Sequence, residues 1–112
     1  MLIILGYAHI QPSVFGQFMN EIRLLAESVR GRDGNISYNI AVEDSLAGKI
    51  LIAERWANHA ALTAHLESAT TVAFTERWQN SMTGAVLKYD AVNERGLTEL
   101  TCSPLIDSKN FY

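Results

Sequence analysis

The sequence predicts an α+β domain in which helices cover one face of an antiparallel sheet. Short apolar runs with the length of strands alternate with longer segments whose apolar residues recur every three or four positions. The resulting order is β-α-β-β-α-β, with the second helical segment divided in two. This is the order of the ferredoxin-like arrangement.

The first half of the chain predicts one strand and one long helix. Residues 2–10 are an apolar run that a proline follows, as expected of a buried strand. An apolar stripe then predicts a helix from Pro12 to Arg30, and the proline suits its first turn because the missing N–H has no partner there. Gly31 is expected to end this helix in the left-handed conformation.

The second half predicts a hairpin, two short helices and a last strand. Asn58 is a good N-cap, because its side chain can accept a hydrogen bond from an unpaired backbone N–H. A polar connection joins the first two of these strands as an antiparallel hairpin. The predicted elements cover residues 36–43, 49–56, 59–67, 70–81 and 84–92.

The length of 112 residues fits one domain. We place the domain at residues 1–92 and treat residues 93–112 as a C-terminal extension. Its apolar run is expected to add a strand or an arm to a partner chain. The 48% apolar and 19% charged residues are typical of a globular protein.

Composition also excludes several classes of partner. The net charge of −3 disfavours duplex DNA, whose phosphates require a basic surface. No stretch approaches the roughly 20 apolar residues of a membrane span. Cys102 is the single cysteine, so no intrachain disulfide can form, and we expect a soluble cytoplasmic protein.

Neither a metal nor a tightly bound cofactor is expected. The three histidines, at positions 9, 59 and 65, are scattered and lack the spacing of metal ligands. Glycine-rich phosphate loops, which a Rossmann-type flavin or nicotinamide site requires, are absent.

Both faces of the predicted sheet are apolar. Alternate positions of the first strand place Leu2 and Ile4 on one side, and Ile3, Leu5 and Tyr7 on the other. Helices cover one face only, so the second face needs another partner. A two-fold homodimer is the simplest solution.

One stretch resembles a known family. The run Glu54-Arg55-Trp56 leads into Ala61-Leu62 and then His65, which is similar to the Glu-x-Trp strand end and Ala-Leu-x-x-His helix of the antibiotic biosynthesis monooxygenase (ABM) domain. Upstream, Arg30, Gly34 and Tyr38 are similar to the family's Arg-x-x-x-Gly-x-x-x-Tyr stretch, and Phe74 falls where the family often has an aromatic residue. The likeness spans roughly residues 1–92.

The resemblance implies a dimeric α/β barrel with a ligand pocket between sheet and helices. The family includes cofactor-free oxygenases acting on phenols, quinol oxidoreductases and a haem-degrading branch. Here Ala69-Thr70 stand where members often have Pro-His. Thr75 stands near the position at which the haem-degrading branch has its histidine iron ligand. Threonine would not replace that imidazole, so we do not expect this chain to degrade haem.

His65 is the leading candidate for a catalytic residue. It lies beside the apolar stripe of its helix, where it could act as a base or hold a substrate hydroxyl, or simply be a buried hydrogen-bonded histidine. The expected substrate-binding residues are aromatic or acidic: Tyr7, Tyr38, Glu54, Trp56, Phe74 and Trp78. A tryptophan at the end of a strand, such as Trp56, is more often a core residue than a ligand contact. Glu54 is expected to form a salt bridge with an arginine. The Phe74 and Trp78 pair, at i and i+4, is expected to edge the cavity although this spacing more often means packing.

Two functional hypotheses follow. The first is a cofactor-independent monooxygenase or quinol oxidoreductase that acts on a small phenolic or quinol-type aromatic ligand. The alternative is a non-catalytic dimeric module of the same fold that binds a small ligand or serves in a stress response. The missing Pro-His favours the second, and the family resemblance favours the first.

Overall fold

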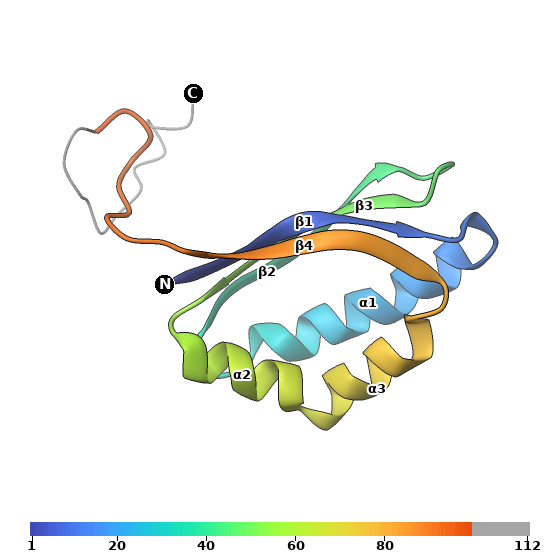
Figure 1. The fold of residues 1–112 in the computed structure, drawn as a ribbon, viewed down its shortest axis with the longest axis horizontal. Coiled ribbons are helices and arrows are strands. Elements are labelled where there is room, and N and C mark those ends of the chain that lie inside the picture. The colour runs from blue at the N-terminus through green and yellow to red at the C-terminus, as the bar shows by residue number, and fades with distance from the viewer. Residues whose placement is uncertain (100–112) are drawn as a thin grey trace.

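The structure, a computed structural model, describes residues 1–99 and has the predicted α+β fold. Four strands form one antiparallel sheet in the order β2-β3-β1-β4, and the helices lie on one side of it (Figure 1). The sheet of the single chain is open, so no barrel closes within it. The elements are β1 (Leu2–Ile10), a short 3-10 helix (Pro12–Val14), α1 (Phe15–Arg30), β2 (Asn35–Asp44), β3 (Lys49–Trp56), α2 (His59–Glu67), α3 (Ala69–Trp78) and β4 (Met82–Asp90).

The ends of α1 differ from the prediction. Its α-helical part begins at Phe15, because Pro12 opens a separate 3-10 turn. The predicted left-handed cap at Gly31 is wrong, since its φ is −91°. Gly34, three residues later, is the left-handed glycine with φ of 78°, and a Cβ there would collide with Ala61. The chain therefore turns sharply after the helix and not at its end.

Pairing with β1 sets the bounds of β4. Nine consecutive pairs run from Ile10 opposite Met82 to Leu2 opposite Asp90. The predicted strand, 84–92, was therefore two residues late, and the predicted helix 70–81 ends earlier, at Trp78. The pattern of apolar residues cannot locate such a boundary, because it does not show which residues of the two strands pair with each other.

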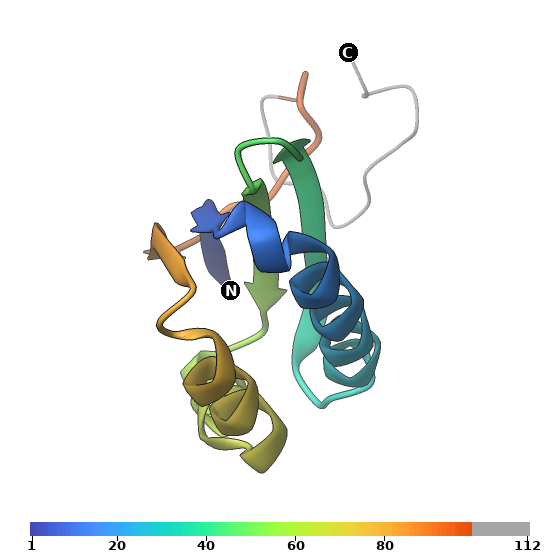
Figure 2. The same cartoon turned by 90° about the vertical axis from the view of Figure 1, so that its right-hand side faces the viewer.

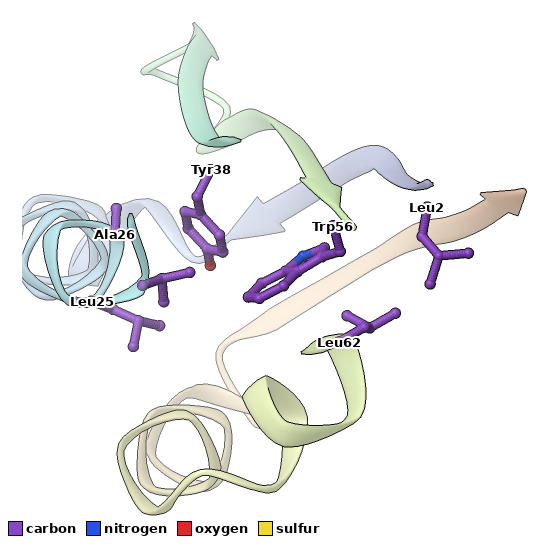
Figure 3. Close-up of a cluster of buried hydrophobic side chains, with 7 residues drawn as sticks. Leu2, Leu25, Ala26, Tyr38, Trp56 and Leu62 are labelled. Atoms are coloured by element: carbon purple, nitrogen blue, oxygen red, sulfur yellow. The ribbon is translucent and has the colours of Figure 1, made fainter. Parts of the chain in front are cut away.

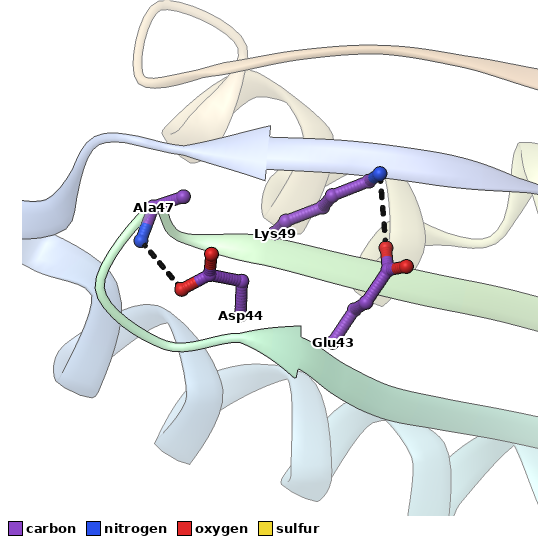
Figure 4. A network of polar contacts seen from close by, with 4 residues as sticks. All are labelled: Glu43, Asp44, Ala47 and Lys49. Carbon is purple, nitrogen blue, oxygen red and sulfur yellow. Dashed lines mark hydrogen bonds and ion pairs between the residues drawn. The ribbon is translucent and has the colours of Figure 1, made fainter.

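The hairpin between β2 and β3 is fixed by local polar contacts (Figure 4). The Asp44 carboxylate accepts hydrogen bonds from the backbone N–H groups of Leu46 and Ala47, at 3.0 and 3.1 Å. Lys49 forms an ion pair with Glu43 at 3.0 Å. Gly48, with φ of 72°, brings its backbone against Ile10, where a Cβ would collide with the carbonyl oxygen. The predicted hairpin is thus confirmed.

The core lies between the sheet and the helices. Viewed from the end, α1 lies below β2, while α2 and α3 lie below the other side of the sheet (Figure 2). Even-numbered residues of β1 and β3 face these helices and include the fully buried Ile50 and Trp56. Two apolar clusters form this core, one around Trp56 and one around Phe18, and Phe74 packs against both.

The opposite face of the sheet is apolar and uncovered in the single chain. Odd-numbered residues of the central and β4 strands point there. Four large apolar side chains keep between 42 and 56% of their surface exposed, namely Leu5, Tyr7, Leu87 and Tyr89. The sequence prediction of a second apolar face is therefore confirmed.

The chain after β4 has neither helix nor strand through residue 99. Its start is held by the backbone N–H of Ala91, which donates to the carbonyl of Met1 at 2.9 Å. The arm predicted within 93–112 falls largely outside the residues that the structure describes. None of the helices in residues 1–99 has the length and apolar character needed to cross a membrane.

Candidate functional site

Trp56 is the centre of the candidate site. It ends β3 with its side chain toward the helices and is fully buried. Its indole Nε1 donates a hydrogen bond to Oε1 of Glu54 at 3.0 Å, and Glu54 is itself only 8% exposed. The arginine partner expected for Glu54 was wrong: within residues 1–99 this carboxylate has no ion pair, and the indole takes that place.

His65 stacks on Trp56. The two rings lie 4.7 Å apart between centroids and are tilted by 24°. The predicted cap positions the helix, because the Asn58 side chain accepts from the backbone N–H of Ala61 at 2.9 Å and so starts α2 just after Trp56. His65 follows two turns into this helix and is 4% exposed.

Tyr38 completes the cluster from β2. It is paired with Glu54 across the two strands, so both side chains project to the helix side. Its ring meets that of His65 edge-on at 5.9 Å. The close-up shows Tyr38 from β2 and Trp56 from β3 facing the side chains of Leu25 on α1 and Leu62 on α2 (Figure 3).

Arg32 contacts the candidate site and is a residue that sequence reasoning missed. Its Nη1 donates to Nδ1 of His65 at 2.7 Å and to the Thr71 hydroxyl at 3.1 Å. Its Nη2 donates to the Thr70 hydroxyl at 2.6 Å and, more weakly, to the Ser28 hydroxyl at 3.4 Å. The run Ser68-Ala69-Thr70-Thr71 at the start of α3 was the one available signal, since it places several hydroxyls together.

This contact fixes the state of His65. Burial and then the Arg32 charge lower the pKa of His65 to about 4, so the ring is neutral at neutral pH. Arginine can only donate, so Nδ1 must accept, and the single ring proton resides on Nε2. His65 therefore presents Nε2 as a hydrogen-bond donor.

The pKa values of the Glu54 carboxyl and the Tyr38 hydroxyl are shifted upward, in the opposite direction to that of His65. Burial raises the pKa of the Glu54 carboxyl, and the Trp56 hydrogen bond offsets part of that rise. Burial, reinforced by the Glu54 charge, raises the pKa of the Tyr38 hydroxyl. Three titratable groups with displaced pKa values thus surround one indole, which is the pattern found at many functional sites.

Each of these groups keeps one polar atom free of protein partners. Oε2 of Glu54, Nε2 of His65 and the hydroxyl of Tyr38 have no hydrogen-bond partner among residues 1–99. Among the residues that the structure describes, only Trp78 Nε1 is a fully buried side-chain polar atom without a partner, so these three atoms keep some contact with solvent. They offer two donors and one acceptor at the edge of the cluster.

The sheet becomes accessible next to this cluster, toward β4. In the same row across the strands, Glu54 is followed by the half-buried Ile4 and then by the exposed Lys88. Val86, one row further and also on the helix side, is 42% exposed. The helix side of β4 is thus the nearest solvent-exposed surface along this row.

The remaining predicted site residues are spread over the molecule. Tyr7 points to the opposite face of the sheet, where Lys49 lies over its ring at 4.4 Å. Trp78 packs edge-on against Phe18 at 5.3 Å in the other cluster, and its buried indole N–H has no hydrogen-bond partner among residues 1–99. The structure does not bring either residue to His65.

Phe74 lies against both clusters and also lines a groove between α1 and α3. His65 and Trp56 do not line that groove. Within residues 1–99, no group of three or more His, Cys, Asp or Glu side chains is placed to hold a metal ion.

The fold and this cluster define a small ferredoxin-like α+β domain with a buried aromatic and acidic site. Residues 1–77 match the model of the family described as antibiotic biosynthesis monooxygenase. The chain belongs to this family, as the sequence resemblance predicted.

Individual relatives agree with this assignment. The protein named "Putative monooxygenase YcnE" of Bacillus subtilis (strain 168) is 25% identical over 69 residues, which are 62% of this chain and 73% of that protein. The crystal structure of a "putative antibiotic biosynthesis monooxygenase" from Deinococcus radiodurans has a TM-score of 0.76 at 22% identity, over 84% of this chain and 95% of that one. Rv0793 from Mycobacterium tuberculosis has a TM-score of 0.74 at 19% identity, over 84% and 97%. These structures support the fold.

Proposed function

We propose that the chain is a cofactor-independent monooxygenase or quinol oxidoreductase that oxidises a small phenolic or quinol-type aromatic at the Trp56 cluster. The observation that supports this most is the meeting of three displaced pKa values and three unpartnered polar atoms around one indole. The family assignment is consistent with the reaction class.

In this proposal Glu54 is the base. A phenol is a weak acid, and a carboxylate with a raised pKa accepts its proton more readily than an ordinary one. Oε2 is the atom available, because Oε1 is held by Trp56. His65, the leading candidate from the sequence, serves as a hydrogen-bond donor through Nε2 and not as the base.

His65 and Tyr38 stabilise the resulting anion. Two donors aimed at a developing negative charge in a buried site are worth more than in water. Trp56 and Phe74 supply apolar walls for the aromatic ring. In this proposal the ligand approaches Glu54 from the β4 side, because Ile4, which is paired with Glu54, is only half-buried.

The electron balance needs only the substrate and dioxygen. A hydroquinone anion transfers two electrons to O₂, and with the two phenolic protons this gives a quinone and hydrogen peroxide. In the monooxygenase variant, a ring carbon that carries two hydrogens, as in an anthrone, loses both and becomes a carbonyl carbon; it takes one oxygen atom of O₂, and the other oxygen atom leaves with the two hydrogens as water. In both, the substrate supplies the electrons and the protein supplies the base and the donors.

The proposed active form is a homodimer joined through the uncovered sheet face. Leu5, Tyr7, Leu87 and Tyr89 form an apolar surface on that face that water otherwise contacts. A second copy covers it without touching the helix side. In this arrangement Tyr7 contributes to the interface and not to the ligand site.

One observation favours the non-catalytic alternative. Nδ1 of His65 is already held by Arg32, and Thr71 Oγ1 lies 3.3 Å from the same nitrogen, as in a structural histidine. A module that binds an aromatic ligand without turnover uses the same donors and walls. Turnover is therefore the property that separates the two functions.

The test is oxygen uptake by pure protein with a series of hydroquinones and anthrones. Wild type should accelerate uptake, and Glu54→Gln should lower kcat by about a hundredfold or more, as loss of a general base does. Glu67→Gln, at an exposed glutamate of α2, is the matched control and should keep the wild-type rate. Equal rates for wild type and Glu54→Gln would contradict the proposal. Ligand binding without any uptake would identify the non-catalytic module.

A further inference from the structure

A groove between α1 and α3 is lined by Leu25 and Phe74, which also pack in the Trp56 cluster, but not by Trp56, Glu54 or His65. Its volume is about 400 Å³, within the range of small-molecule sites. Its apolar floor is formed by the buried Leu25 and the half-buried Phe74, and the exposed Leu24 and Ala73 line its sides.

The two ends of the groove are polar but differ in charge. At one end Arg77 pairs with Glu21 at 2.7 Å, so the charges there cancel. At the other end the Ser28 and Thr70 hydroxyls line the groove, and both accept from Arg32. Seven residues separate the ends along each helix, which corresponds to about 10 Å.

Arg32 does not itself line the groove but contacts Ser28 and Thr70 at its end, and it is a cation with one spare N–H donor. None of the ion pairs among residues 1–99 involves it, so its charge faces no carboxylate there. Its Nε–H has no acceptor in the same residues, and its Nη2 contact with Ser28 is long, at 3.4 Å. Nε and Nη2 form one edge of the guanidinium, the edge that binds a carboxylate through two parallel hydrogen bonds.

We propose that this groove binds a small amphipathic monocarboxylate, with its carboxylate on Arg32, Ser28 and Thr70 and its apolar body along the floor. The single uncompensated cation selects one negative charge, and the neutral far end accommodates an apolar tail. Ligand binding in the groove is measured without turnover at Glu54, so the two proposals succeed or fail separately.

A ligand at this place also affects the Trp56 cluster. The guanidinium that would hold the carboxylate is the one that donates to Nδ1 of His65. A carboxylate on its other edge offsets the positive charge next to the imidazole. Ligand binding in the groove is thereby coupled, through the Arg32 side chain, to the electrostatic environment of the His65 imidazole.

The experiment titrates the full chain with octanoate and, separately, with octan-1-ol, and follows binding by calorimetry. Octanoate should bind at one site per chain and at least tenfold more tightly than the alcohol, which lacks the charge. Ala73→Trp fills the groove from an exposed position and should weaken octanoate binding at least tenfold. Ala64→Trp, at an exposed alanine of α2 outside the groove, should bind like wild type.

A second pair of variants tests the charge. Arg32→Gln should weaken octanoate to the level of the alcohol, whereas Arg23→Gln, at an exposed arginine of α1 outside this groove, should not. The Ala73→Trp result stands even if Arg32→Gln fails to fold. Equal affinity for the two probes, no binding at millimolar concentration, or wild-type affinity in Ala73→Trp would overturn the proposal.

Discussion

At the scale of single residues, His65 shows what the sequence could and could not predict. Its helical position and its place beside the apolar stripe were predictable from spacing, and its burial is confirmed. Its protonation state was not predictable, because it depends on Arg32, which lies 33 positions away and meets it only in the fold. The sequence left two roles open, a base or a hydrogen-bond partner for a substrate hydroxyl, and in our proposal the Arg32 contact favours the second.

The lowered pKa of His65 has a consequence for stability. The pKa of His65 is about 4 in the folded chain and 6.5 ordinarily, so between these pH values the unfolded chain binds a proton at His65 and the folded chain does not. The contribution of neutral His65 to the free energy of unfolding is therefore fully present above pH 6.5 and is lost as pH falls toward 4. A shift of this size corresponds to about 3 kcal/mol at most.

We therefore expect the difference in unfolding free energy between wild type and His65→Gln to shrink by up to about 3 kcal/mol between pH 7 and pH 4. The raised pKa of Glu54 acts in the opposite direction, since the folded state takes up that proton first, but it acts in both proteins. Urea denaturation across this pH range measures the difference. Parallel curves for the two proteins would show that His65 is not buried as described.

At the scale of elements, the sequence predicted the order and kind of every α-helix and strand through β4, but not the separate 3-10 turn at Pro12. Strand β3 and helix α2 have the predicted bounds, because an end signal such as Asn58 is local. The errors fall where an end depends on a distant partner. Strand β4 begins where β1 requires it, and the left-handed glycine is Gly34, whose Cα faces Ala61 on α2.

At the scale of the whole molecule, the sheet has two apolar faces and helices for one. The helix side contains the core and the candidate site, and the other side exposes a surface rich in leucine and tyrosine. Alternation along the strands made both faces visible in the sequence. The sequence could not show what covers the second face, because contact with a partner chain produces no local sequence pattern.

The dimer is tested by a matched pair of substitutions. Leu87 on the uncovered face and Leu66 on α2 are each 56% exposed in the single chain. At low micromolar concentration we expect wild type to sediment at twice its chain mass of 12.4 kDa and Leu87→Asp to sediment as a single chain. Leu66→Asp should remain a dimer. A stable folded wild-type monomer would remove the assembly from the account.

Everything proposed for catalysis requires that an aromatic hydroxyl reaches the free atoms of Glu54, His65 and Tyr38. Nitrogen NMR of histidine-labelled protein, with hydroquinone added in the absence of oxygen, tests this directly. We predict that His65 starts neutral with its proton on Nε2, and that this N–H signal shifts in a saturable way, while the signals of the exposed His9 and His59 do not. An Nε2 signal of His65 that stays unchanged up to saturating ligand would contradict a site at Trp56.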